Sequence, residues 1–146
     1  MAINIDARYR VKRNAAQDEQ MRYLVQELKI FNSYAQIIVI SAIIGYNFEK
    51  YVPFEKSAET ILMQFFDERD KDIINLIAYA HEKDQNVLRN DPTKMYKIFE
   101  SYANGGFPVL VSKLGIDFVD KEKNDRLTIL RNYYRLLLTK SLLGKK

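Results

Sequence analysis

Basic and polar side chains recur along one stretch near the end of the chain, and their types suit phosphate binding. They fall at i, i+3, i+4, i+7 and i+11, so a helix would place them on one face, in the order Thr128, Arg131, Asn132, Arg135 and Thr139. Arginines one turn apart reach successive phosphates, and the other side chains add hydrogen bonds. The spacing therefore predicts contact with a nucleic-acid backbone. A solvated face of an amphipathic helix is the alternative that the pattern leaves open.

Positive charge gathers at both ends of the chain. Residues 1–14 carry four cations against one carboxylate, and residues 121–146 carry eight against two, although the whole chain has a net charge of only +4. The middle is therefore acidic, and the basic ends either bind an anionic partner or pack on the body. We predict DNA phosphate contacts by nine residues: Arg8, Arg10, Lys12, Arg13, Arg126, Arg131, Asn132, Arg135 and Lys140.

An aromatic segment offers a different kind of contact. The stretch 46–54 contains Pro53 and no helical period, which predicts a loop, and it carries Tyr46, Phe48, Tyr51 and Phe54. Such a loop either folds back onto the core, the reading we favour, or forms a contact surface. Since tyrosine is common at interface hot spots, these four residues are the predicted partner-binding set of an adaptor, with tyrosines of the last helix.

Candidates for catalysis are few. An acidic cluster suitable for Mg²⁺ lies at Asp67, Glu68, Asp70 and Asp72. The same residues flank a predicted helix start, where acidic side chains are expected from the helix dipole alone. His81 is the single histidine, there is no cysteine, and no partner for acid–base chemistry is evident. We therefore predict no catalytic residue, no metal and no cofactor, and a protein that is not an enzyme.

A glycine pair in Asn104-Gly105-Gly106 has two readings. Its backbone amides could face an anion, as glycine-rich turns sometimes do. We favour a tight corner between two helices, in which glycine supplies positive φ.

The element that must hold these residues in place is the apolar run 34–44. Ser33 and Gln36 form a capping-box pattern at its start, and Gly45 stands where a left-handed C-terminal cap belongs. A helix that is apolar all round must be covered on most sides, so this is the predicted core helix. A buried strand is the alternative, because the β-branched run 37–40 suits one.

Amphipathic cover is predicted around this helix. Apolar spacing and caps predict helices over 15–30, 71–83, 92 to the glycine pair, 108–115 and 121–142, with Asp70 and Asp120 as two of the caps. The fold class is mainly α: a compact single-domain bundle of five to six helices, with short extended segments at 60–66 and 116–119. A basic arm (1–14) precedes the helical domain (15–143), and a frayed tail (144–146) follows it. No signal peptide or membrane span is evident, so a cytoplasmic protein is expected.

Three segments resemble one protein family. Phe99-Glu-Ser-Tyr-Ala-Asn-Gly-Gly-Phe107 resembles the "FEEYANGGL" signature of dnd system-associated protein 4, a family of small proteins encoded beside bacterial DNA phosphorothioation genes. The segment 31–46 is similar to that family's "F-x-T/S-Y-A-D-x-x-x-F-A-A-x-x-G-Y", and 72–78 resembles its next apolar helix. The chain departs from the pattern at Gln36, Ser101 and Phe107.

The resemblance implies a context rather than a reaction. It implies bacterial anti-phage defence, through DNA sulphur modification or the restriction (restriction–modification) that depends on it, and no catalytic residue. Our hypothesis is a non-enzymatic accessory protein that binds DNA, or a DNA-bound partner of the same system, through its basic ends. A protein–protein adaptor without DNA contact is the alternative.

Overall fold

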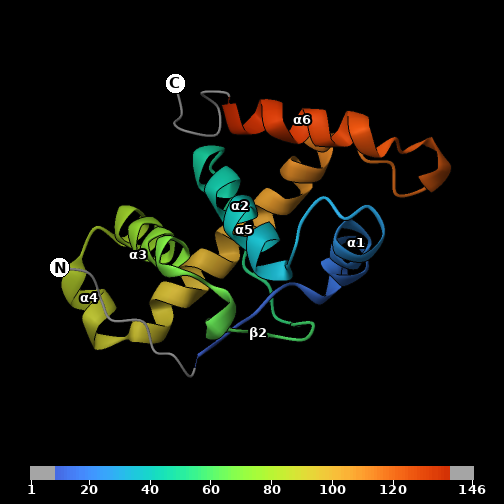
Figure 1. Cartoon of the computed structure of the whole chain (residues 1–146). Helices are drawn as coiled ribbons and strands as arrows, with labels where there is room; N and C mark the ends of the chain where they lie inside the picture. Colours follow the sequence, from blue (N-terminus) through green and yellow to red (C-terminus); the bar gives the residue numbers. More distant parts are fainter. Residues whose placement is uncertain (1–8, 139–146) are drawn as a thin grey trace.

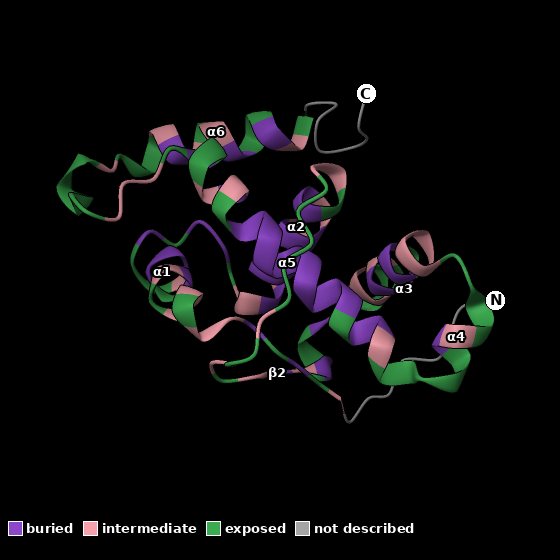
Figure 2. Cartoon of the chain, turned by 180° about the vertical axis from the view of Figure 1, so that it is seen from behind, coloured by how far each residue is buried: buried purple, intermediate pink, exposed green. Residues whose placement is uncertain are grey.

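Two long helices cross at the centre of the molecule and carry most of the core. The computed structural model describes residues 9–138, and within them α2 (Tyr34–Asn47) crosses α5 (Pro92–Leu114) (Figure 1). Figure 2 shows the buried residues concentrated on this pair, with exposed residues on the outer elements. The core-helix prediction for 34–44 is confirmed. The mainly α fold class is confirmed as well, since six α-helices and one two-stranded sheet make up the described chain.

Glycines set the distance between the two central helices. A Cβ added to Gly45 would lie 2.0 Å from the Tyr102 carbonyl oxygen, and one added to Gly106 would lie 1.9 Å from the Ser41 carbonyl oxygen. Only glycine permits this approach of the two backbones. Gly45 is therefore inside α2, and its predicted role as a C-terminal cap is wrong. The predicted N-cap is confirmed, because the Ser33 hydroxyl accepts from the Gln36 amide at 3.2 Å.

Helix α5 passes through the predicted corner without a break. Neither glycine of the pair has a positive φ, so the corner at 104–106 and the separate helix 108–115 are wrong. Pro108 lacks the N–H that would bond the carbonyl of Asn104, and Gln17 Nε2 donates to that oxygen at 3.1 Å instead. The helix ends at Gly115, whose φ of +75° closes the left-handed cap.

The predicted helix 15–30 is three short pieces. They are the 3₁₀ turn η1 (Ala15–Gln17), α1 (Asp18–Arg22) and the π-helical turn η2 (Tyr23–Glu27). Asn14 caps the first of these turns by accepting from the Ala16 amide, and the side chain of Gln17 bonds α5.

A small sheet joins the N-terminal segment to the middle of the chain. Strand β1 (Arg10–Val11) pairs antiparallel with β2 (Ile61–Leu62), with Arg10 opposite Leu62 and Val11 opposite Ile61. The extended segment expected at 60–66 is therefore present in part, and the turn η3 (Met63–Phe65) follows it. Residues 116–119 form no strand, which corrects the second extended segment. We expected residues 1–14 to be an arm outside the domain, whereas the described residues 9–14 are part of the fold.

The remaining helices start away from their predicted caps. Helix α3 (Glu68–Glu82) begins at Asp67, which forms a capping box with Asp70, three residues before the predicted cap. Helix α4 (Gln85–Asn90) was not predicted. Helix α6 (Arg126–Leu138) follows the 3₁₀ turn η4 (Lys121–Lys123) and so starts five residues late. Within residues 9–138 no helix has the length and apolar character needed to cross a bilayer. The predicted tail 144–146 lies outside the described residues.

Candidate nucleic-acid interface

Helix α6 presents two arginines outward. Its inner face buries Ile129, Tyr133 and Leu136, spaced i, i+4 and i+7, and this spacing places Arg131 and Arg135 on the other side. Both arginines are exposed, and neither pairs with a carboxylate in the part of the chain that the structure describes. Two exposed cations one helical turn apart suit successive phosphates. This is the portion of the predicted stripe that is available to DNA.

The rest of the stripe is occupied by the protein itself. Asn132 Nδ2 donates to the Leu114 carbonyl at 2.9 Å and so satisfies the C-terminal end of α5. The Thr128 hydroxyl donates to Asp125 at 2.6 Å in the first turn of α6. Thr139 lies outside the described residues. The prediction of one continuous phosphate-binding stripe is therefore reduced to its two arginines.

Arg126 has a structural role of the same kind. Its Nε donates to the Leu28 carbonyl at 2.6 Å, and its Nη2 donates to the Lys29 carbonyl at 3.1 Å. These carbonyls follow η2, where the helix leaves acceptors without internal donors. The guanidinium joins the start of α6 to that turn, so its donors are used within the fold.

The predicted N-terminal cations fall into a buried and an exposed group, because side chains alternate between two sides along the extended segment that contains β1. Arg13 is 3 % exposed. Its guanidinium pairs with Asp18 at 2.6 Å and donates to the Glu59 carbonyl at 3.0 Å. The same group lies 4.2 Å from the ring centre of Tyr34. Arg10 and Lys12 point the other way along the strand and are exposed. Arg8 and Lys140 lie outside the described residues.

The described parts of the two basic ends, residues 9–14 and 121–138, do not share a surface. Figure 1 places α6 at one end of the molecule and the β1–β2 pair at the opposite end, with α2 and α5 between them, and Figure 2 agrees. A short DNA segment lying on α6 would therefore not reach Arg10 and Lys12. The two sets of cations are best considered as separate sites.

The outer face of α6 is also apolar. Three large side chains on it are 72 %, 58 % and 83 % exposed, namely Leu127, Tyr134 and Leu138. Together with Arg131 and Arg135 they form what we call the outer face of α6. Leu127 and Tyr134 thus lie away from the buried side of α6, which Ile129, Tyr133 and Leu136 form. Leucines contribute little to phosphate contact, and this combination also suits a protein surface.

The aromatic segment contacts the core only in part, because Tyr46 and Tyr51 are 37 % and 39 % exposed, and Tyr46 belongs to α2 rather than to the predicted loop. Tyr46 and Tyr51 pack edge-on against Tyr102, with ring centres 5.5 and 4.9 Å away, and Tyr51 stacks on His81 at 4.6 Å. His81 Nδ1 lies 2.7 Å from the Tyr102 hydroxyl, and burial raises the pKa of that hydroxyl. The single histidine thus belongs to an aromatic cluster. Phe48 lies under the Lys113 ammonium at 5.0 Å, and Phe54 is half-buried.

The acidic cluster is a helix start. Asp67 accepts from the Asp70 amide at 2.8 Å and Asp70 accepts from the Asp67 amide at 3.1 Å, and burial raises the pKa of Asp70. Among residues 9–138, no three His, Asp or Glu side chains come together as metal ligands do. The capping box accounts for the spacing of Asp67 and Asp70.

The strongest polar constellation was missed by the sequence prediction. Buried polar side chains of α5 bind segments far away in the chain: Asn104 accepts from Asn14 Nδ2 and donates to the Val52 carbonyl, at 2.8 and 2.7 Å. Glu100, 4 % exposed, accepts from the Tyr9 hydroxyl and the Lys12 amide, both at 2.8 Å. The signal was present, since polar residues four apart interrupt the apolar face of α5. We interpreted that stretch as a corner and so missed it.

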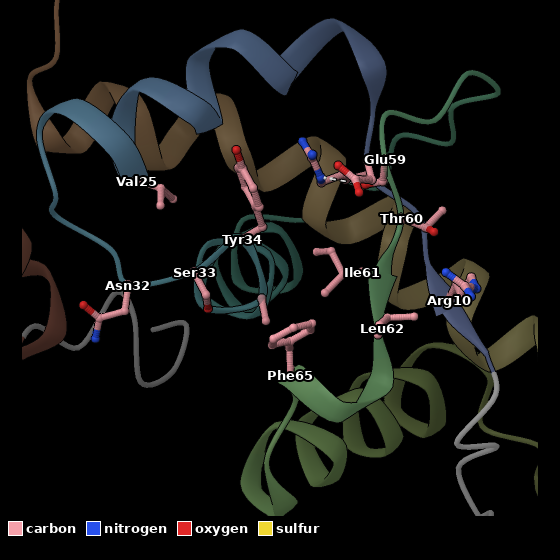
Figure 3. Close-up of a pocket in the computed structure, with 12 residues that line it drawn as sticks. Arg10, Val25, Asn32, Ser33, Tyr34, Glu59, Thr60, Ile61, Leu62 and Phe65 are labelled. Atoms are coloured by element: carbon pink, nitrogen blue, oxygen red, sulfur yellow. Dashed lines mark hydrogen bonds between the residues drawn. The ribbon is translucent and has the colours of Figure 1, made fainter.

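One pocket lies over the first turn of α2. It has a volume of about 420 Å³, and Figure 3 shows Val25, Ile61 and Phe65 arriving from three elements around that turn, with Arg10 on the strand beyond β2. Arg13 also lines it, but its guanidinium is already bonded to the protein. The pocket is chiefly apolar, so it does not extend the basic surface of α6.

Similarity to known proteins gives a context for this geometry. The family described as DNA sulphur modification system-associated protein 4 matches residues 10–136. No curated protein and no solved structure matches the chain.

Proposed function

The chain belongs to the family of DNA sulphur modification system-associated protein 4, and we propose that it is a non-enzymatic accessory component of such a system that contacts DNA through the outer face of α6. The family match covers residues 10–136, which include nearly the whole of α6. It links the protein to sulphur modification of DNA, and the contact with DNA is our inference from the geometry.

The observation that supports this proposal is the availability of Arg131 and Arg135. Of the nine residues predicted to bind DNA, these two are exposed, adjacent on a regular helix and free of carboxylate partners in the described chain. Phosphate contacts by two arginines give affinity without base specificity. The protein would then hold or approach DNA while another component performs the chemistry.

A salt series tests the proposal. Fluorescence anisotropy of one labelled duplex, with and without a phosphorothioate, gives the slope of log affinity against log salt. Replacing Arg131 and Arg135 by alanine removes two phosphate contacts, so the slope should become shallower by about 2. The matched control is the double variant Arg69→Ala, Arg89→Ala, which removes the same charge from exposed positions on α3 and α4.

If the slope of log affinity against log salt were equal in the two double variants, α6 would not be part of the interface, because the net charge falls equally in both. No binding by the wild type at low salt would refute DNA contact altogether. A difference between the two duplexes would indicate direct recognition of the sulphur-modified backbone.

A second function is supported by the apolar residues of the same face. Leu127 and Leu138, at 72 % and 83 % exposure, have no use in phosphate contact, and Tyr134 lies between them. An adaptor would bind a protein of the same system here. Pull-down from nuclease-treated extract separates the two functions, because capture that survives nuclease treatment and is lost in Leu127→Asp, Leu138→Asp requires protein contact.

A further inference from the structure

The N-terminal segment 9–12 is fastened to α5 by a buried carboxyl group. Glu100 Oε2 accepts both from the Tyr9 hydroxyl and from the Lys12 amide, each at 2.8 Å, although these donors lie about 90 residues earlier in the chain. The Tyr9 ring lies flat on Tyr96, with ring centres 3.7 Å apart and planes 10° from parallel. One carboxyl group on α5 therefore holds both ends of a four-residue segment.

The attachment beyond this segment is of a different kind. Arg13 is buried by its pairing with Asp18 and by its bond to the Glu59 carbonyl, and Asn14 bonds Asn104. These contacts contain no other buried carboxyl group that faces the segment. Movement of residues 9–12 would therefore pivot at Arg13, break the pairing of β1 with β2 and take Val11, which is 0 % exposed, out of the core.

We propose that segment 9–12 is a latch that closes over Glu100 and opens when that carboxyl group loses its proton. The closed latch covers the carboxyl group, which is 4 % exposed, and pairs β1 with β2. Opening releases the backbone edge of Ile61–Leu62 and carries Arg10 and Lys12 away from the body. This latch is independent of the α6 contact proposed above.

The burial of Glu100 favours this direction of response, whereas the charges that face it act in the opposite direction. Burial raises its pKa to about 7, which outweighs the opposite influence of the Lys12 amide, the Tyr9 hydroxyl and the ammonium groups of Lys12 and Lys97. Burial and the Glu100 charge raise the pKa of Tyr9 well above its ordinary value, so that hydroxyl stays a donor. The closed latch thus prefers neutral Glu100, whereas an open one exposes the carboxyl group to water and lets it ionise at an ordinary pKa.

The expected size of the effect follows from linkage. With a pKa of about 7 in the closed state and the ordinary 4.5 in the open state, the fraction of open latch increases about tenfold between pH 6 and pH 8. Glu100 is an acid whose pKa is higher in the closed state than in the open state. The stability of the closed latch therefore decreases as the pH rises towards 7, and it is constant well above pH 7.

Amide hydrogen exchange of Lys12 measures this opening in the full chain. After correction for intrinsic exchange, its protection should fall about tenfold from pH 6 to pH 8 in the wild type and stay constant in Glu100→Gln, which is neutral throughout. Glu59→Gln, at an exposed position beside β2, should keep the wild-type fall. Constant wild-type protection, or the same fall in Glu100→Gln, would overturn the latch.

A second variant keeps the test decisive if Glu100→Gln folds poorly. Tyr9→Phe keeps the stacked ring but removes one donor to the ionised carboxylate, so the decrease in protection should be larger than in the wild type. An unchanged or smaller decrease would overturn the proposal. Exchange of amides in the central part of α5 should be the same in all variants at each pH, which restricts the effect to the latch.

Discussion

The two basic ends of this chain have opposite relations to the fold. At the N-terminal end, Arg13 is buried and bonded to three groups, and the segment before it is held by Glu100. At the C-terminal end, Arg131 and Arg135 have no carboxylate partner among residues 9–138 and lie on the outside of α6. The same kind of side chain therefore has a structural function at Arg13 and provides an available surface at Arg131 and Arg135. Variants at the two ends should differ accordingly.

Arg13→Ala should have the largest effect on stability. It leaves Asp18 without its buried partner and opens a space beside Tyr34, so the free energy of unfolding should decrease by about 3 kcal/mol. Urea unfolding followed by circular dichroism measures the change. Arg10→Ala in the same N-terminal segment is the control, with an expected change of at most about 0.5 kcal/mol because Arg10 is exposed. Similar losses for both would contradict the division of this segment into a buried and an exposed side.

Arg126→Ala should have an intermediate effect. The lost bonds join the start of α6 to the carbonyls of Leu28 and Lys29, and the side chain is partly in contact with water, so a decrease of about 1 kcal/mol is expected. The same unfolding experiment applies, with Lys123→Ala as an exposed control nearby. No change would mean that α6 is held by its apolar face alone.

Arg131→Ala with Arg135→Ala should have the smallest effect on stability. Exposed side chains without fixed partners contribute little, so the free energy of unfolding should change by less than about 0.5 kcal/mol. A loss of more than about 1 kcal/mol would indicate that these arginines support the fold, and a change in DNA affinity could then not be assigned to lost contacts.

The sequence predicted helix identity better than helix ends. The run 34–44 was recognised because both its apolar character and its Ser33 cap are local features. The continuity of α5 was not, because glycine has a local preference for turns, whereas here Gly106 is needed for contact with Ser41 on another helix. Pro108 led to a wrong helix boundary for the same reason. The carbonyl that this proline cannot bond accepts from the side chain of Gln17, which is distant in sequence. Such partners are distant in sequence and cannot be read from one segment.

The residues of the candidate site were likewise predictable only where the relevant feature is local in the sequence. Arg131 and Arg135 follow from helical spacing, which is local. The distinction between them and Asn132 depends on where α5 ends, and the distinction between Arg10 and Arg13 depends on a strand pairing across about 50 residues. Residue type and charge therefore identified the cations, and only tertiary contacts separated the structural ones from the exposed ones.

The bonds from Tyr9 to Glu100 and from Asn14 to Asn104 have a consequence for synthesis on the ribosome. The partners are 91 and 90 residues apart, so the N-terminal segment is made long before its seat on α5 exists. At roughly 5–20 residues per second, it waits about 5 to 18 seconds for the residues that complete it. During that interval β1 cannot pair with β2 until residue 62 has been added. The N-terminal segment is therefore among the last parts of the fold to form its contacts.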